Sequence, residues 1–87
     1  MASYEVRLSR SARKELVAIR VKADRTRVVA ALERLSSDPR PLGSVKLTTS
    51  ASTYRIRIGD YRVIYEVLDD ILVVDVTKVG HRRDVYR

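Results

Sequence analysis

The sequence predicts an α+β domain, in which an N-terminal strand and a two-helix hairpin pack on one face of a three- to four-stranded, mainly antiparallel sheet. Three observations lead to this prediction. Residues 4–8 alternate between apolar and polar, residues 12–35 carry apolar residues at helical spacing, and residues 54–79 return to a period of two. A strand, two helices and then several antiparallel strands are typical of a two-layer α+β fold.

The chain has 87 residues, which is the length of one small domain, so residues 1–87 are treated as a single domain. It contains no cysteine and one histidine, which argues against a disulfide framework and a structural zinc site, and we expect neither metal nor cofactor. No apolar run is long enough to span a membrane and no signal-peptide pattern opens the chain, so the expected location is the cytoplasm.

The chain is strongly basic. It has 18 Lys and Arg against 11 Asp and Glu, for a net charge of +7. A charge of this size on a small domain indicates a polyanion or an acidic protein as partner. A basic surface without any partner is the alternative.

The first strand is predicted at residues 4–8, and the first helix follows it. Ser9 or Ser11 is expected to cap this helix, with Glu15 in its first turn, where a carboxylate suits the helix dipole. Asp24 is expected to cap the second helix. The predicted buried stripes are Ala12, Leu16, Ile19 and Ala23 in the first helix, and Val28, Ala31, Leu32 and Leu35 in the second. Two prolines within residues 36–43 end the helical region.

The most informative stretch is the predicted β-hairpin at residues 54–67. With Gly59-Asp60 as its two-residue turn, Arg57 lies opposite Arg62, and Arg55 shares their face. The other face is apolar and carries Tyr54, Ile56, Ile58, Tyr61, Val63, Tyr65 and Val67. Like charges directly across a ladder are destabilising. The arginines therefore indicate a surface that binds an anion.

The remaining strands flank this hairpin. Residues 44–47 are predicted to form a short strand, and residues 71–79 the last strand, ended by Gly80. Asp69-Asp70 is predicted as the turn that leads into it, which places Leu68 opposite Ile71. In this register Leu72, Val74 and Val76 lie on the apolar face, whereas Asp75 and Thr77 lie on the arginine face, opposite Ile64 and Arg62.

These motifs, in this order, resemble the RelE/ParE toxin superfamily of type II toxin–antitoxin modules. The resemblance covers nearly the whole chain, and its most specific parts are the hairpin at residues 54–67 and the segment Val79-Gly80-His81-Arg82-Arg83-Asp84-Val85-Tyr86. It implies a cognate antitoxin protein as partner and one of two activities. RelE-like members cleave messenger RNA in the ribosomal A site, and ParE-like members are non-enzymatic inhibitors of DNA gyrase.

RelE-like cleavage implies a set of site residues. This reaction is metal-independent: the 2′-hydroxyl attacks the adjacent phosphate, which requires positive charge on the developing phosphorane and groups that move protons. By this resemblance, Arg62 matches the hairpin arginine that contacts the scissile phosphate, and Arg82 matches the arginine just after the last strand. Tyr86 matches the C-terminal tyrosine that stacks on or orients a base. Arg57 is also expected to be catalytic. Further RNA contacts are expected from Arg55, Lys46 and Arg83.

The sequence departs from the best-known members at two strand positions. Arg55 and Arg57 stand where those members have lysines, one of which is proposed as the base, and arginine stays protonated at any workable pH. His81 is therefore the leading acid–base candidate and Tyr86 the second. A surface histidine at a strand end is the alternative for His81. The co-occurrence of Arg57, Arg62, Arg82 and Tyr86 favours the ribonuclease. The missing lysine base favours the gyrase inhibitor, and a degenerate, non-toxic binding module is a third interpretation.

Overall fold

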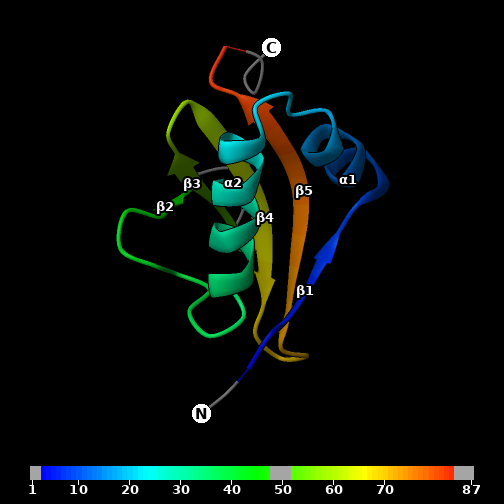
Figure 1. Cartoon of the computed structure of the whole chain (residues 1–87). Helices are drawn as coiled ribbons and strands as arrows, with labels where there is room; N and C mark the ends of the chain where they lie inside the picture. Colours follow the sequence, from blue (N-terminus) through cyan, green and yellow to red (C-terminus); the bar gives the residue numbers. More distant parts are fainter. Residues whose placement is uncertain (1–2, 48–51, 84–87) are drawn as a thin grey trace.

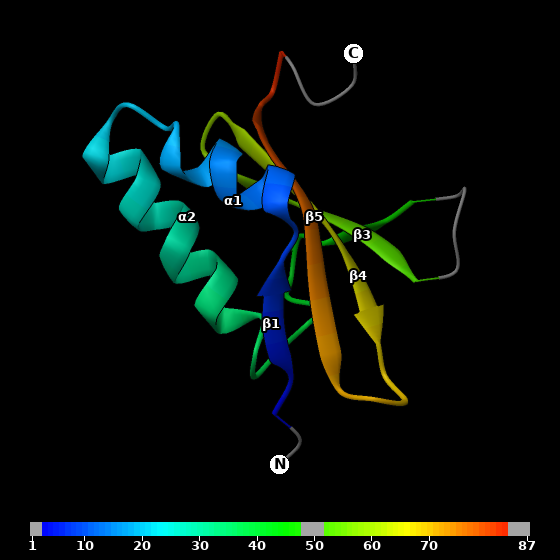
Figure 2. The ribbon, with the colours of Figure 1, turned by 90° about the vertical axis from the view of Figure 1, so that its right-hand side faces the viewer.

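Two helices cover one face of a five-stranded sheet (Figure 1, Figure 2). The computed structural model describes residues 3–47 and 52–83. The elements in chain order are β1 (Glu5–Leu8), α1 (Arg10–Val17), α2 (Lys22–Arg34), β2 (Val45–Lys46), β3 (Thr53–Ile58), β4 (Tyr61–Leu68) and β5 (Val73–His81).

The sheet order is β1-β5-β4-β3-β2, with β1 parallel to β5 and the other pairs antiparallel. The predicted α+β class and two-helix layer are confirmed. The sheet has five strands in place of three to four, because β1 joins it at one edge and the two-residue β2 at the other. Within the described ranges, no helix combines the length and apolar character that a membrane crossing requires.

The N-cap of helix α1 is one of the two serines that the sequence predicted. Ser9 is its N-cap, and the Ser9 hydroxyl accepts a hydrogen bond of 3.0 Å from the backbone N–H of Ala12. Ser11 lies inside the helix. The prediction that Glu15 lies in the first turn was wrong, because the helix begins at Arg10 and Glu15 falls in the second turn.

Helix α2 starts two residues before the predicted cap. Its N-cap is Val21, which makes no side-chain capping bond, and Asp24 lies within the first turn. The prediction of Asp24 as N-cap was therefore wrong, although a carboxylate there still suits the helix dipole.

The buried stripes differ between the two helices. Every predicted residue of the second stripe is buried: Val28, Ala31, Leu32 and Leu35. In the first stripe Ala12 and Ile19 are buried and Leu16 is half-buried, but Ala23 is exposed. The prediction for Ala23 was wrong because α1 ends at Val17: Ile19 lies in the connection between the helices, and Ala23 belongs to α2.

The hairpin of β3 and β4 has the predicted register. Ile58 pairs with Tyr61 and Arg57 with Arg62. The apolar side of the hairpin faces the helices, and its side chains on β4 are almost completely buried: Val63, Tyr65 and Val67. The opposite side, which faces away from the helices, carries Arg55, Arg57 and Arg62 and is called the arginine face below.

Strand β5 departs from the predicted register. Leu68 pairs with Val73, so residues 69–72 form the connection and Leu72 adopts a left-handed conformation with φ of 54°. The prediction that Leu72 lies on the apolar face was wrong, because it belongs to this turn. Val74 and Val76 are still buried because the pairing shifts by two residues, which preserves the face.

A β-bulge changes the second half of β5. Tyr65 pairs with Val76 but Ile64 pairs with Lys78, so Thr77 is the extra residue. The two-residue shift places Asp75 opposite Glu66, and the shift and the bulge together place Gly80 opposite Arg62, so both predicted pairings were wrong. Gly80 also does not end the strand, which continues to His81.

Arg40 links the segment after α2 to the end of the sheet where β4 connects to β5. Its guanidinium donates to Asp69 Oδ2 at 2.6 Å and to the Tyr54 hydroxyl at 3.0 Å. Tyr4 on the N-terminal side donates to Asp69 Oδ1 at 2.6 Å, and the buried Tyr65 hydroxyl donates to the Pro39 carbonyl at 2.8 Å. Burial raises the pKa of Tyr65 to about 12, so this hydroxyl remains a donor at neutral pH.

Candidate nucleic-acid interface

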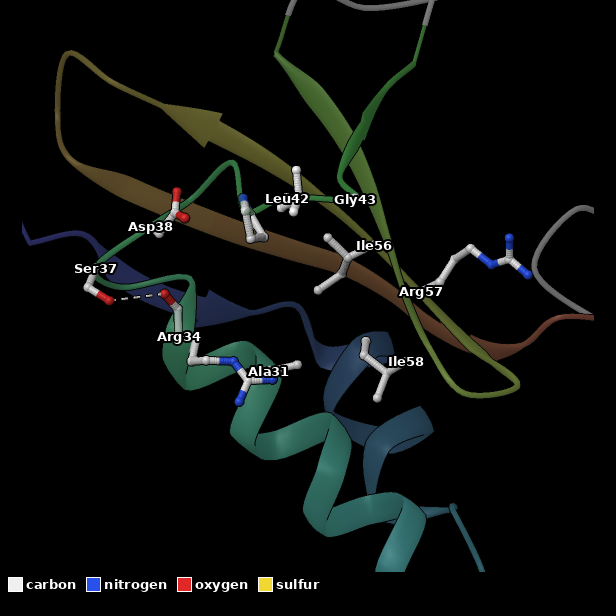
Figure 3. Close-up of a pocket in the computed structure, with 10 residues that line it drawn as sticks. Ala31, Arg34, Ser37, Asp38, Leu42, Gly43, Ile56, Arg57 and Ile58 are labelled. Carbon is white, nitrogen blue, oxygen red and sulfur yellow. Dashed lines mark hydrogen bonds between the residues drawn. The ribbon is translucent and has the colours of Figure 1, made fainter.

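Strands β3 and β4 position two arginines side by side on the arginine face. Because side chains alternate along a strand, Ile56 and Ile58 point toward the helices and Arg57 points away from them, as Figure 3 shows. Arg57 is exposed, whereas Arg62 is only 9% exposed and donates through Nη1 to the Tyr61 carbonyl at 3.3 Å. Arg55 lies half-buried on the same face. The arrangement concentrates positive charge on this face.

Arg82 lies at the same end of the sheet. Its backbone N–H donates to the Asp60 carbonyl at 2.7 Å, and its Nε lies 3.9 Å from Asp60 Oδ1, in the turn between β3 and β4. The row Arg57–Arg62–Gly80 crosses the three strands just before this turn. The structure therefore brings the backbone of Arg82 close to the predicted pair Arg57 and Arg62.

Arg27 of α2 also reaches the hairpin turn. A Cβ atom placed on Gly59 would lie 3.4 Å from Arg27 Nη1 and 3.5 Å from Nη2. The position of Arg27 near the turn depends on how α2 crosses the hairpin. A basic helix residue carries no sequence signal for such a contact.

His81 lies on the other side of the sheet. It pairs with Tyr61, whose ring packs toward the helices, and the two rings meet edge to face with centroids 5.7 Å apart. The His81 Nδ1 accepts from the backbone N–H of Arg83 at 3.3 Å. The structure does not bring the imidazole to the arginine face, because the bulge at Thr77 reverses the direction of the following side chains.

The other predicted RNA contacts are dispersed. Lys46 pairs with Tyr54, which places it on the helix side of the sheet, and Arg83 is exposed just beyond β5. Tyr86 lies outside the described residues. Among residues 3–47 and 52–83, no three side chains of His, Asp or Glu gather in a way that could hold a metal ion.

A groove lies on the helix side, between α2, the segment 37–43 and β3. It has a volume of about 570 Å³ and is lined by Ala31, Arg34, Ser37, Asp38, Pro41, Leu42, Gly43, Ile56, Arg57 and Ile58. Figure 3 shows Ile56 and Ile58 pointing into it and the Arg57 side chain pointing away. Arg57 therefore borders this groove, but its side chain belongs to the arginine face on the other side of β3.

A small basic domain with two helices on a five-stranded sheet, and arginines clustered on the open hairpin face, has the architecture of RelE-like toxins. Residues 6–86 match the sequence model of the family described as ParE toxin of type II toxin–antitoxin system, parDE, and the chain belongs to this family within the RelE/ParE superfamily.

RelE-type relatives support membership of the superfamily. Toxin RelG from Mycobacterium tuberculosis is 32% identical over 84 residues, which cover 97% of each chain. The RelE–RelB complex from Pyrococcus horikoshii contains a chain that is 30% identical, with a TM-score of 0.83 over 95% of this chain and 99% of that one. The isolated RelE toxin of Escherichia coli is 28% identical, with a TM-score of 0.80 over 97% of this chain and 92% of that one.

Proposed function

We propose that this toxin is a ribosome-dependent endoribonuclease that cleaves messenger RNA in the cytoplasm and is neutralised by a cognate antitoxin. The observation that carries the proposal is the cross-strand pair Arg57 and Arg62 on the arginine face, with Arg82 anchored at the adjoining turn. Support for an antitoxin comes from the structural relatives, several of which are toxin–antitoxin complexes.

In the proposed reaction the 2′-oxygen of one nucleotide forms a bond to the adjacent phosphorus and the bond to the 5′-oxygen breaks. The products are a cyclic phosphate and a free 5′-hydroxyl, with one proton lost from the 2′-hydroxyl and one gained by the leaving oxygen. Arg57, Arg62 and Arg82 stabilise the negative charge of the phosphorane, for which guanidinium groups are well suited. Arg55 and Arg83 contact flanking phosphates.

Proton transfer is the less developed part of the proposed site. Arginine cannot accept a proton at neutral pH, and His81 faces the helix side. In this proposal the arginines therefore supply most of the rate enhancement through charge and orientation. His81 remains the acid–base candidate for RNA that passes round the end of β5, and Tyr86 remains the candidate for orienting a base.

The test is induction of the toxin without antitoxin, followed by primer extension on cellular messenger RNA. Wild-type toxin is expected to produce discrete cleavage sites, and Arg57→Ala or Arg62→Ala is expected to abolish them. Arg13→Ala, an exposed arginine on α1, is the matched control. Growth arrest with intact messenger RNA would contradict the proposal.

The second candidate function is inhibition of DNA gyrase. Two observations favour it: the matching family is described as ParE toxin, and the arginine face carries no lysine at positions 55 and 57. A supercoiling assay with purified gyrase separates the two functions. Loss of supercoiling by the wild-type toxin, with ribosome-bound messenger RNA intact, would establish the inhibitor.

A further inference from the structure

Glu15 links helix α1 to the second half of β5. Its Oε2 accepts from Lys78 Nζ at 2.6 Å, and its Oε1 accepts from the backbone N–H of Val79 at 3.0 Å. The Glu15 side chain is 26% exposed and that of Lys78 is 39% exposed. A single carboxylate thus binds one side chain and one backbone group of the same strand.

The need for this carboxylate follows from the sheet topology. β1 pairs with β5 only from Val73 to Val76, so within the described residues no strand pairs with the outer edge of β5 beyond that point. Two side chains take over the hydrogen bonding there. The Ser9 hydroxyl donates to the Thr77 carbonyl at 3.4 Å, and Glu15 accepts from Val79. At Val79 the Glu15 carboxylate therefore accepts the hydrogen bond that a neighbouring strand would otherwise accept.

The contact falls immediately after the β-bulge. Thr77 is the extra residue, and its hydroxyl donates to the Ile64 carbonyl at 3.2 Å. The bulge turns Val79 into the core, where it is 1% exposed, and it sets Gly80 opposite Arg62. Because a bulge locally disrupts the ladder, the pairing of β5 with β4 just after it is supplemented by the contact with Glu15.

We infer that Glu15 is a positioning residue for the arginine site: by fixing Val79 it holds the end of β5, and with it Arg82, beside Arg57 and Arg62. Val79 lies three residues before Arg82, whose other anchor is the hydrogen bond from its N–H to the Asp60 carbonyl. Lys78 holds the carboxylate in place. The catalytic consequence of this inference rests on the proposed ribonuclease function. The role of Glu15 in holding the end of β5 does not.

The test compares Glu15→Gln with Glu15→Met, two variants of nearly equal volume. Glutamine keeps an oxygen that accepts from Val79, whereas methionine keeps only the packing. Hydrogen exchange of the amides from Val79 to Arg82 is measured on the free toxin. We expect exchange to be about fivefold faster in Glu15→Met, as for one lost hydrogen bond, and close to wild type in Glu15→Gln. Equal exchange in all three proteins would overturn the inference.

The catalytic consequence is measured on ribosomes programmed with messenger RNA. Glu15→Met is expected to lower kcat roughly tenfold to a hundredfold with little change in KM, because misplaced Arg82 affects the transition state more than binding. Glu15→Gln is expected to keep kcat close to the wild-type value, because glutamine still accepts the hydrogen bond from Val79. Wild-type kcat in Glu15→Met would refute positioning. Absence of cleavage by the wild type would refute the proposed function instead, and the exchange measurement would still decide the role of Glu15.

Discussion

Arg57 on β3 and Arg62 on β4 are direct cross-strand neighbours although both are basic residues. Such a pair costs about 0.2–1 kcal/mol relative to neutral residues, because like charges directly opposite repel. Arg62 is only 9% exposed, so part of this repulsion acts away from the solvent that would screen it. The pair therefore favours anion binding at some cost to the free energy of unfolding.

The first prediction separates these two effects. Arg57→Gln is expected to raise the free energy of unfolding by up to about 1 kcal/mol while it lowers messenger RNA cleavage. Urea unfolding at low and high salt measures the gain, which should shrink as salt screens the charges. Arg13→Gln, exposed on α1, is the control and should change stability by less than about 0.5 kcal/mol. A stability loss in Arg57→Gln would mean that the pair is structurally favourable.

The second prediction concerns the salt dependence of RNA binding. Each phosphate contact that is lost lowers the slope of log affinity against log salt by about 0.7 for single-stranded nucleic acid. Arg57→Gln is therefore expected to reduce the slope by about 0.7 with a short single-stranded RNA. Fluorescence anisotropy at a series of salt concentrations provides the measurement. An unchanged slope would remove Arg57 from the phosphate site.

The register of the β3–β4 hairpin could be predicted, whereas that of β4 and β5 could not. Alternation of apolar and charged residues around Gly59-Asp60 leaves one register that buries the apolar face. The turn into β5 depends on Leu72 at φ of 54°, a left-handed conformation for which leucine gives no sequence signal. The bulge at Thr77 also has no sequence signal, and it places His81 on the side of the sheet that faces the helices.

Contacts between distant elements were the other part that the sequence did not reveal. Glu15 meets Lys78 and Val79, and Arg27 meets the turn at Gly59, only because of how the helices cross the sheet. Residue types alone indicate neither contact. Sequence reasoning therefore identified the cationic residues of the site but not the residues that support them.

The third prediction is a pH dependence of stability. Hydrogen bonds from Arg40, and then from Tyr4, hold the pKa of Asp69 below its usual value of about 3.9. A lowered folded-state pKa contributes stability above the unfolded pKa, and this contribution is lost as the pH falls through the folded one. Asp69→Asn should therefore be less stable than wild type at pH 7, and the difference should disappear in strong acid.

Chemical unfolding of both proteins at a series of pH values below neutrality measures this difference. Asp70→Asn is the matched control, because within the described residues Asp70 takes part in none of the salt bridges. A constant difference between wild type and Asp69→Asn across the acid range would show that the Asp69 charge does not contribute.

The fourth prediction concerns the hairpin turn. Gly59 has a φ of +60°, where a residue with a Cβ atom is strained by roughly 1–2 kcal/mol. Gly59→Ala should lower the free energy of unfolding by about this amount, and Gly59→Asn by less, because asparagine tolerates the left-handed region. Thermal and urea unfolding measure both changes.

Arg27 allows the strain at Gly59 to be separated from crowding. The new Cβ would lie 3.4 Å from Arg27 Nη1, at the flexible end of a long side chain that can move aside. The effects of Gly59→Ala and Arg27→Ala on unfolding should therefore be additive to within about 0.5 kcal/mol in a double-mutant cycle. A larger coupling would show that the Arg27 guanidinium is held rigidly against the turn, and would make it a fixed part of the cationic surface beside Arg82.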